Sequence, residues 1–320
     1  MKRRAIQRLR GPALWAVLWA MLLAAPCLLA GPAVAQQSSA AALASRHAAV
    51  RDQLLASPLG VPVLVTSVES GEQTRGEVLA LLPLPFDTLA ANLGVPRDWC
   101  AIVLLHLNIK ACTHESLAGQ DWLTFYSGRK GFESAEQAYP LRFDFRASKP
   151  QADYLDIDLQ AATGPLGTHD YRITLDAIAV PQGSFVRFGY TYHASTLSRM
   201  AMKTYLATLG RDKVGFTVIG PGPDGKPLLV QGSRGIVERN AVRYYYAIQA
   251  HLEGLARPKG QRFERDLERW FELTERHPRQ LHELERGEYL QAKRQEFAEQ
   301  SKRQQALDAA GAANRTAPAR

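Results

Sequence analysis

Two cysteines in the middle of the chain, with two histidines beside them, are the side chains whose types and spacing most clearly suggest chemistry. Cys100, His106, Cys112 and His114 could all bind zinc. Structural zinc sites, however, usually contain a short Cys-x-x-Cys or His-x3-His element, which this cluster lacks. We therefore predict a disulfide between Cys100 and Cys112 and no metal site. Two buried free thiols and a metal centre are the alternatives.

The N-terminal segment supports the disulfide because it has the pattern of an export signal. A basic stretch is followed by an apolar run from Leu14 to Ala30, and Ala33-Val34-Ala35 is the small-x-small pattern of a signal peptidase site. We predict cleavage after Ala35, so that the mature chain begins at Gln36 in the periplasm. That compartment is oxidising, and an even pair of cysteines remains after cleavage. An uncleaved membrane anchor is the alternative.

Carboxylates and histidines that could catalyse a reaction do not form a recognised catalytic motif. Asp156 and Asp158 lie two residues apart, hence side by side on one face of a strand, and we interpret them as a hydrated pair. His106, His169 and His193 are the candidate bases if the protein is an enzyme, although loop or edge positions fit them better. We therefore predict no catalytic residues and no cofactor, and leave the question of catalysis open.

Aromatic side chains are the more informative group. They recur on candidate strands, and a candidate long helix carries further ones, which predicts a wall that encloses either a filled core or an elongated apolar cavity. Tyrosine adds polar groups to such a wall. The predicted ligand-binding residues are Phe143, Phe188, Tyr190, Tyr192, Ala241, Tyr245 and Ile248. We interpret Arg243 as part of a surface salt bridge, with a role as the partner of a polar head group as the alternative.

The elements that must position these residues alternate between apolar and polar positions with a period of two. This pattern is typical of antiparallel strands with one wet and one buried face. It predicts a meander of hairpins. The predicted strands cover 61–68, 76–82, 107–112, 122–126, 142–146, 154–160, 171–177 and 186–192.

Helical patterns flank these strands. We expect a mobile lead-in over 36–47 and short helices over 46–56, 87–93 and 99–105, with Asp87 as a helix N-cap. A further helix is predicted over 197–209, followed by a hairpin over 214–231. The long helix over 236–255 has an apolar stripe, which consists of Val237, Ala241, Tyr245, Ile248 and Leu252.

Composition sets the remaining bounds. The chain has 320 residues, of which 46% are hydrophobic and 22% are charged, which excludes a collagen, a wholly disordered chain and a multi-span membrane protein. The net charge is +8, but residues 1–35 contain five basic residues and no acid. The rest is close to neutral, which argues against a nucleic-acid partner. Residues 257–320 are rich in charge, and we expect solvated helices that pack weakly, with disorder from Ala309.

Taken together, the order of elements resembles the START-like (SRPBCC, helix-grip) superfamily, which includes lipid-transfer proteins and polyketide cyclases. The segment Gly76-Glu-Val-Leu-Ala-Leu-Leu-Pro-Leu-Pro-Phe86, followed by Trp99-Cys100, is similar to its opening strand and helix pair. The segment Arg239-Asn-Ala-Val-Arg-Tyr-Tyr-Tyr-Ala-Ile248 is similar to its closing helix. The likeness covers about 61–255 and is greatest to exported bacterial members. The insertion at 197–231 and the charged tail depart from it.

This resemblance implies an α+β fold in which a curved antiparallel sheet grips a long C-terminal helix. We predict a signal peptide over 1–35, a lead-in over 36–60, a START-like domain over 61–256 and a charged helical tail over 257–320. The predicted function is binding or transfer of a hydrophobic, lipid-like small molecule. A cyclase or hydrolase on the same scaffold and a protein-interaction module acting through the tail are the alternatives. Transient contact with a membrane, and a protein partner for 257–320, stay open.

Overall fold

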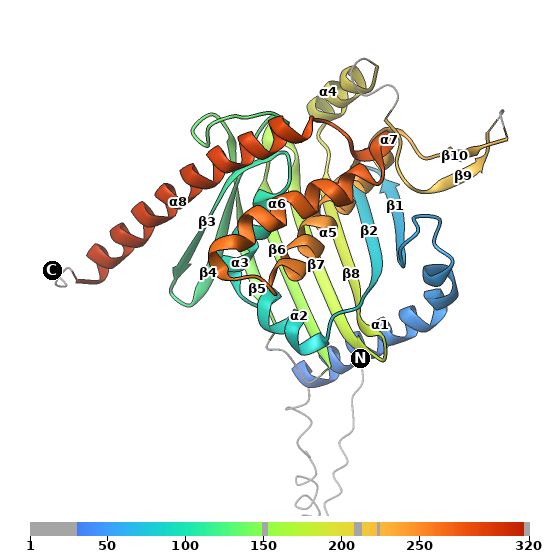
Figure 1. Ribbon diagram of the computed structural model, residues 1–320, viewed down its shortest axis with the longest axis horizontal. Coiled ribbons are helices and arrows are strands. Elements are labelled where there is room, and N and C mark those ends of the chain that lie inside the picture. Colours follow the sequence, from blue (N-terminus) through green and yellow to red (C-terminus); the bar gives the residue numbers. More distant parts are fainter. Residues whose placement is uncertain (1–30, 149–152, 208–212, 223–224, 317–320) are drawn as a thin grey trace, which may run out of the picture. The chain divides into compact units, whose positions relative to one another are not determined.

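The computed structural model describes residues 31–148, 153–207, 213–222 and 225–316 (Figure 1). The chain divides into two compact units, 1–39 and 40–320. Of the first unit, residues 31–39 are described, and they are helical. The predicted signal peptide lies largely outside the described residues, so cleavage after Ala35 stays a prediction. Within the described ranges, no helix is both long enough and apolar enough to cross a membrane.

The second unit is built on one antiparallel sheet of eight strands, in the order β1-β2-β8-β7-β6-β5-β4-β3. Strands β3 to β8 form a continuous meander, and the β1–β2 hairpin is added beside β8. The strands are β1 (Val63–Ser70), β2 (Gln73–Leu82), β3 (Ile109–Leu117), β4 (Gln120–Ser127), β5 (Tyr139–Ala147), β6 (Tyr154–Thr163), β7 (His169–Val180) and β8 (Gly183–His193).

One face of this sheet is covered by α5 (Gly232–Gly254), which α6 (Lys259–Glu275) covers in turn (Figure 1). The predicted stripe of α5, from Val237 to Leu252, is buried. Because α5 lies between a sheet and another helix, its opposite side is buried as well, including Tyr244 and Tyr246. The predicted helix-grip arrangement and the α+β fold class are confirmed.

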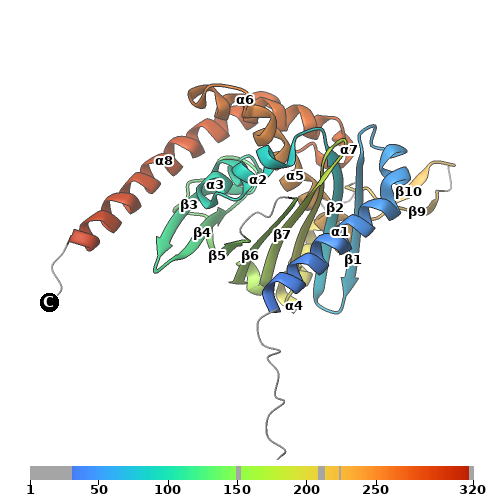
Figure 2. The same cartoon turned by 90° about the horizontal axis from the view of Figure 1, so that it is seen from below.

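The other face of the sheet is partly covered by residues 40–55 of α1 (Gly31–Leu55), as Figure 2 shows. Leu43, Val50 and Leu54 recur at helical spacing and pack against side chains of four strands, namely Leu79, Tyr154, Ile178 and Phe185. The prediction of a mobile lead-in over 36–47 is therefore wrong for its described part. An alanine-rich segment with such a stripe gains enough apolar burial to stay helical on a sheet.

Two short helices, α2 (Phe86–Leu93) and α3 (Pro96–Leu104), connect β2 to β3. Trp99 is buried and its indole N–H donates to the carbonyl oxygen of Leu93 over 2.8 Å, which fixes the angle between these helices. The predicted N-cap at Asp87 is wrong: the cap position is Pro85, and Asp87 lies in the first turn. There its carboxylate still interacts favourably with the positive end of the helix dipole.

The C-terminal segment packs far more tightly than we predicted. After α7 (Pro278–Leu281), α8 (Arg286–Thr316) lies along β3, and Tyr289, Lys293 and Glu296 are fully buried. The helix is described as far as Thr316, past the point at which we expected disorder. The charged composition of α8 did not indicate this packing, because the side chains that attach the helix to the sheet are themselves polar.

The inserted segment forms a helix and a hairpin, as predicted. A short 3-10 helix, η1 (Pro165–Gly167), lies against α4 (Thr196–Ala207). The hairpin consists of β9 (Val218–Pro221) and β10 (Pro227–Leu229). Glu238 of α5 holds the chain just before this hairpin, because its buried carboxylate accepts the backbone N–H groups of Phe216 and Thr217 over 2.6 and 3.0 Å.

Candidate functional site

A cavity of about 390 Å³ lies beside α5, between η1, β7, β8 and α4. Its size falls in the range that is common for small-molecule sites. Its apolar and aromatic lining residues are Pro165, Leu166, Tyr171, Tyr190, Tyr192, Ala201, Met202 and Ile236. Its polar lining residues are Asn108, Lys130, Thr168, Ser198, Arg239, Asn240, Arg243 and Glu283. The cavity therefore offers both apolar and charged groups to a ligand.

The aromatic lining residues belong to a cluster of tyrosines on β7, β8 and α5. Alternation along β8 places Tyr190 and Tyr192 on the same face, where their ring centroids are 5.9 Å apart. Tyr171 of β7 stacks on Tyr192 at 5.7 Å, and Tyr244 lies 5.6 Å from Tyr190. Burial raises the pKa of Tyr192 to about 12 and that of Tyr190 well above its ordinary value. Both hydroxyls therefore stay neutral hydrogen-bonding groups at physiological pH.

The charged lining residues centre on Glu283, which lies just after α7. Its carboxylate is 2.9 Å from a guanidinium nitrogen of Arg243 and 2.7 Å from the Lys130 ammonium. Burial alone would raise the pKa of Glu283, but the charges of Arg243, Lys130 and Lys213 hold it below its ordinary value. The group is therefore ionised. Arg243 thus forms a salt bridge, but it is 3% exposed and lines the cavity, so the prediction that this salt bridge lies at the surface is wrong.

The predicted ligand-binding residues divide between the cavity and the core. Tyr190 and Tyr192 line the cavity. Phe143 lines a smaller void of about 60 Å³ that also contacts Tyr190. Phe188, Ala241, Tyr245 and Ile248 are buried in the core, and none of them lines any of the four best-formed cavities among the described residues. The stripe that faces the sheet is thus packed, and the opening lies to one side of it.

Sequence reasoning named Arg243 but missed Ile236, Arg239 and Asn240, the other residues of α5 that line the cavity. Ile236, Asn240 and Arg243 follow one another at steps of four and three, on a different face from the stripe. That spacing was the available signal. Met202 and Leu166 could not have been found in this way, because their contribution depends on how α4 and η1 fold over the sheet.

The three candidate histidines do not reach the cavity wall. His106 is buried, stacks on Tyr244 at 4.4 Å, and accepts the backbone N–H of Asn108 at Nδ1 over 3.1 Å. Burial, together with the charges of Arg243, Lys293 and Lys110, lowers the pKa of His106 well below its ordinary value, so it is neutral. His169 and His193 lie together, close to Asp170, at the beginning of β7 and the end of β8.

The disulfide between Cys100 and Cys112 is confirmed. It joins α3 to β3 with 5.0 Å between the two Cα atoms, within the range of natural disulfides. With both sulfurs bonded to each other, the alternative of a zinc site at these cysteines is wrong. His114 instead lies 2.8 Å from Asp121 across the β3–β4 pair.

No protein-family model matches this chain, and no curated protein matches it. Among solved structures it is similar to a STAR-related lipid transfer protein from Xanthomonas axonopodis, with 12% identity, a TM-score of 0.36, and 60% of this chain and 92% of that chain covered. It is also similar to CalU16 from Micromonospora echinospora, with 11% identity, a TM-score of 0.29, and 67% and 96% covered. A protein from Chromobacterium violaceum matches at 10% identity and a TM-score of 0.27, over 43% and 92%.

Proposed function

We propose that the protein binds an amphipathic small molecule in the cavity between α4, α5 and β8, and that it does so in the periplasm. The observation that carries this proposal is that the 390 Å³ cavity is lined both by the tyrosine cluster of β7 and β8 and by the charged cluster of Arg243, Lys130 and Glu283. Desolvation of the ligand's apolar part would drive binding, and the polar groups would orient its other end.

The location of the cavity supports binding over a purely structural role. It is lined in part by α4, a helix on which two apolar side chains, Leu197 and Met200, are more than half exposed. A helix that exposes leucine and methionine while it lines a cavity is suited to contact an apolar ligand on its way in. The proposed location rests on the predicted signal peptide and is compatible with the disulfide, which persists in an oxidising compartment.

Three alanine-to-tryptophan variants test the cavity. Ala201→Trp adds bulk to the cavity wall on α4, whereas Ala298→Trp places the same side chain on an exposed position of α8. Ala241→Trp places it in the packed core. The probe is the dye 1-anilinonaphthalene-8-sulfonate, which has an apolar ring system and one anionic group. We expect saturable binding to the parent protein and to Ala298→Trp, and a loss of at least tenfold in affinity for Ala201→Trp.

The thermal midpoint separates occupation of the cavity from unfolding. Ala201→Trp should keep a midpoint near that of the parent, because the added ring fills a void. A parent protein that does not bind the dye, or an Ala201→Trp variant that binds it unchanged, would overturn the proposal. Mass spectrometry of protein purified from a periplasm, followed by organic extraction, identifies a ligand retained by the parent and lost by Ala201→Trp.

A further inference from the structure

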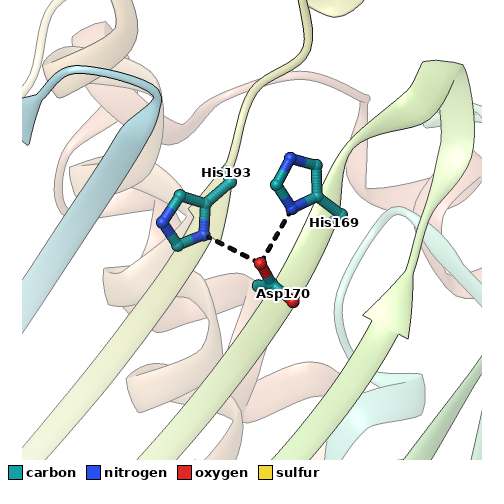
Figure 3. Close-up of side chains that lie close together, drawn as sticks. All are labelled: His169, Asp170 and His193. Atoms are coloured by element: carbon teal, nitrogen blue, oxygen red, sulfur yellow. Dashed lines mark hydrogen bonds and ion pairs between the residues drawn. The ribbon is translucent and has the colours of Figure 1, made fainter.

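We propose that His169, Asp170 and His193 form a binding site for a divalent transition-metal ion of the zinc type. The three side chains lie together at the end of the sheet where β7 begins and β8 ends (Figure 3). This site is separate from the cavity and does not depend on the proposed function. The spacing of these residues in the sequence does not predict the site, because the two imidazoles come together only when His169 pairs with His193 across β7 and β8.

A β-bulge aims the three groups at one point. The β7–β8 register shifts between His169 and Arg172, and Asp170 has a φ of 50°, in the left-handed region that aspartate tolerates better than most residues. In a regular strand, neighbouring residues such as His169 and Asp170 would point to opposite faces. The bulge cancels this alternation, so that the Asp170 carboxylate points between the imidazoles, as Figure 3 shows.

The distances fit a shared ion. Oδ2 of Asp170 is 2.9 Å from Nδ1 of His169 and 3.8 Å from Nδ1 of His193, and one ligand atom from each of the three residues lies within 4.8 Å of the others. Two ligand atoms on a tetrahedral zinc ion, each about 2.0–2.1 Å from the metal, are about 3.3 Å apart. The two observed separations between Asp170 and the histidines lie on both sides of this value, so small side-chain rotations would bring these atoms to it.

The donor set selects the class of metal. Two imidazole nitrogens and one carboxylate oxygen suit zinc and neighbouring first-row ions, whereas magnesium and calcium prefer oxygen ligands. Nδ1 of His193 is also buried and has no hydrogen-bond partner among the described residues. A metal ion between the three groups would supply the missing partner of this nitrogen.

The residues behind the imidazoles are of the kind that orients metal ligands. A histidine bound to a metal usually donates its other ring N–H to a carboxylate or a carbonyl group. Nε2 of His169 lies 4.0 Å from Oε2 of Glu72, which Arg199 holds at 3.1 Å. Nε2 of His193 lies 3.4 Å from the amide nitrogen of Gln73, and a half-turn of that amide brings its oxygen to the same place. Glu72, in the β1–β2 turn, and Gln73, the first residue of β2, thus lie beside the outer nitrogens of the two ligands.

Metal binding by the full mature chain tests this site. After treatment with a chelator, the protein is titrated with Zn²⁺ in competition with a chromogenic indicator, and separately with Ni²⁺ and Mg²⁺. We expect one equivalent of Zn²⁺ to bind, weaker or no binding of Mg²⁺, and a loss of at least tenfold in affinity for His169→Ala, His193→Ala and Asp170→Asn. His114→Ala is the matched control, since His114 pairs with Asp121 without a second histidine.

The thermal midpoint, measured with and without Zn²⁺, distinguishes a variant that has lost the metal site from one that has misfolded. Asparagine tolerates the backbone conformation of Asp170, so Asp170→Asn should fold like the parent. Zn²⁺ should raise the thermal midpoint of the parent and of His114→Ala but not that of Asp170→Asn, because a ligand that binds the folded state stabilises it. The proposal fails if the parent binds no stoichiometric Zn²⁺, or if the doubly substituted His169→Ala, His193→Ala protein binds it as tightly as the parent.

Discussion

At the scale of single residues, the outer face of the sheet contains two facing carboxylates, and the pKa of one of them, Asp156, is raised. Asp156 of β6 lies opposite Asp176 of β7. Asp176 is held by the hydroxyl of Tyr154 at 3.1 Å and by Arg187 at 2.7 Å. Partial burial, followed by the charge of Asp176, raises the pKa of Asp156 to about 6. The hydrated pair of Asp156 and Asp158 predicted from the sequence is thus divided, since Asp158 binds Arg172 instead.

This raised pKa predicts a pH-dependent stability. The unfolded chain releases the Asp156 proton near its ordinary value, whereas the folded protein holds it until about pH 6. The folded state therefore binds more protons between about pH 4 and pH 6, and stability falls as the pH rises through this window. Asp156→Asn removes the effect.

Its thermal midpoint, relative to the parent, should rise from pH 4 to pH 7 and then stay level. Asp158→Asn, which breaks an ion pair with Arg172, should not stabilise the protein at any pH. A difference between Asp156→Asn and the parent that does not change with pH would contradict the assignment.

Gly76 is the residue that lets the long helix approach the sheet. A Cβ atom built on Gly76 would lie 2.9 Å from the carbonyl oxygen of Val237 and 3.2 Å from Cβ of Ala241. We expect Gly76→Ala to destabilise the protein by about 1–3 kcal/mol, since the backbone of α5 must shift. Gly260→Ala is the control, because nothing lies within 4 Å of its Cβ position. Urea unfolding of the two variants measures the difference in their unfolding free energies. Equal midpoints would contradict the prediction, because they would show that α5 shifts away from the new Cβ atom at no cost.

At the scale of elements, α8 is fixed to the edge of the sheet by buried polar groups. Glu296 lies between the ammonium groups of Lys110 at 3.0 Å and Lys293 at 2.8 Å, and all three side chains are buried. Burial lowers the pKa of Lys293 to about 8, although Glu296 opposes the shift. Gln300 and Gln304 then accept the backbone N–H groups of Cys112 and His114 at 2.7 and 2.8 Å. The free edge of β3 is thereby covered, which protects it from pairing with other chains.

Substitution of Glu296 should detach this helix. Glu296→Gln leaves two buried ammonium groups without their counter-charge, and such a loss costs about 3–5 kcal/mol. Glu288→Gln, at an exposed position in the first turn of α8, should be nearly neutral. Hydrogen exchange of β3 amides identifies the cause: exchange should rise at Cys112 and His114 in Glu296→Gln. Unchanged exchange there would show that α8 stays docked without the carboxylate.

At the scale of the whole molecule, the space between sheet and long helix is filled, and the opening lies beside it. Ala241 is fully buried and faces Gly76, so no room remains under the centre of α5. Insertion of α4 and the β9–β10 hairpin before α5 leaves the cavity near the first half of that helix, where Ile236, Asn240 and Arg243 face α4 and η1.

Ala241→Trp tests this division. The new ring overpacks the core, and we expect a loss of about 1–3 kcal/mol or more in unfolding free energy. Dye affinity of the protein that remains folded should stay within about threefold of the parent, since Ala241 does not line the cavity. Calorimetry and dye titration at the same temperature measure both. Loss of dye binding without loss of stability would move the binding site under the centre of α5.

Local patterns were enough to predict most elements of this fold. Period-two alternation located β5, β6, β7 and β8 to within a few residues, because one face of an antiparallel sheet must be apolar, and apolar runs with their turns located the other four strands. The stripe from Val237 to Leu252 predicted the buried helix for the same reason. The Cys100–Cys112 disulfide followed from an export pattern and an even number of cysteines, without any knowledge of distance.

The tertiary structure decided everything that depends on residues far apart in the sequence. Whether Tyr190 or Ala241 faces a void depends on how closely the backbone of α5 approaches the sheet. Gly76 allows that close approach, because it has no Cβ atom to meet the carbonyl oxygen of Val237. The charges of α8 look solvated in the sequence because their partner, Lys110, lies on a distant strand. His169 and His193 become neighbours through a strand pairing and a bulge. Hydrophobic periodicity predicts which face of a helix or strand is buried, but only the tertiary structure determines which residues that face contacts.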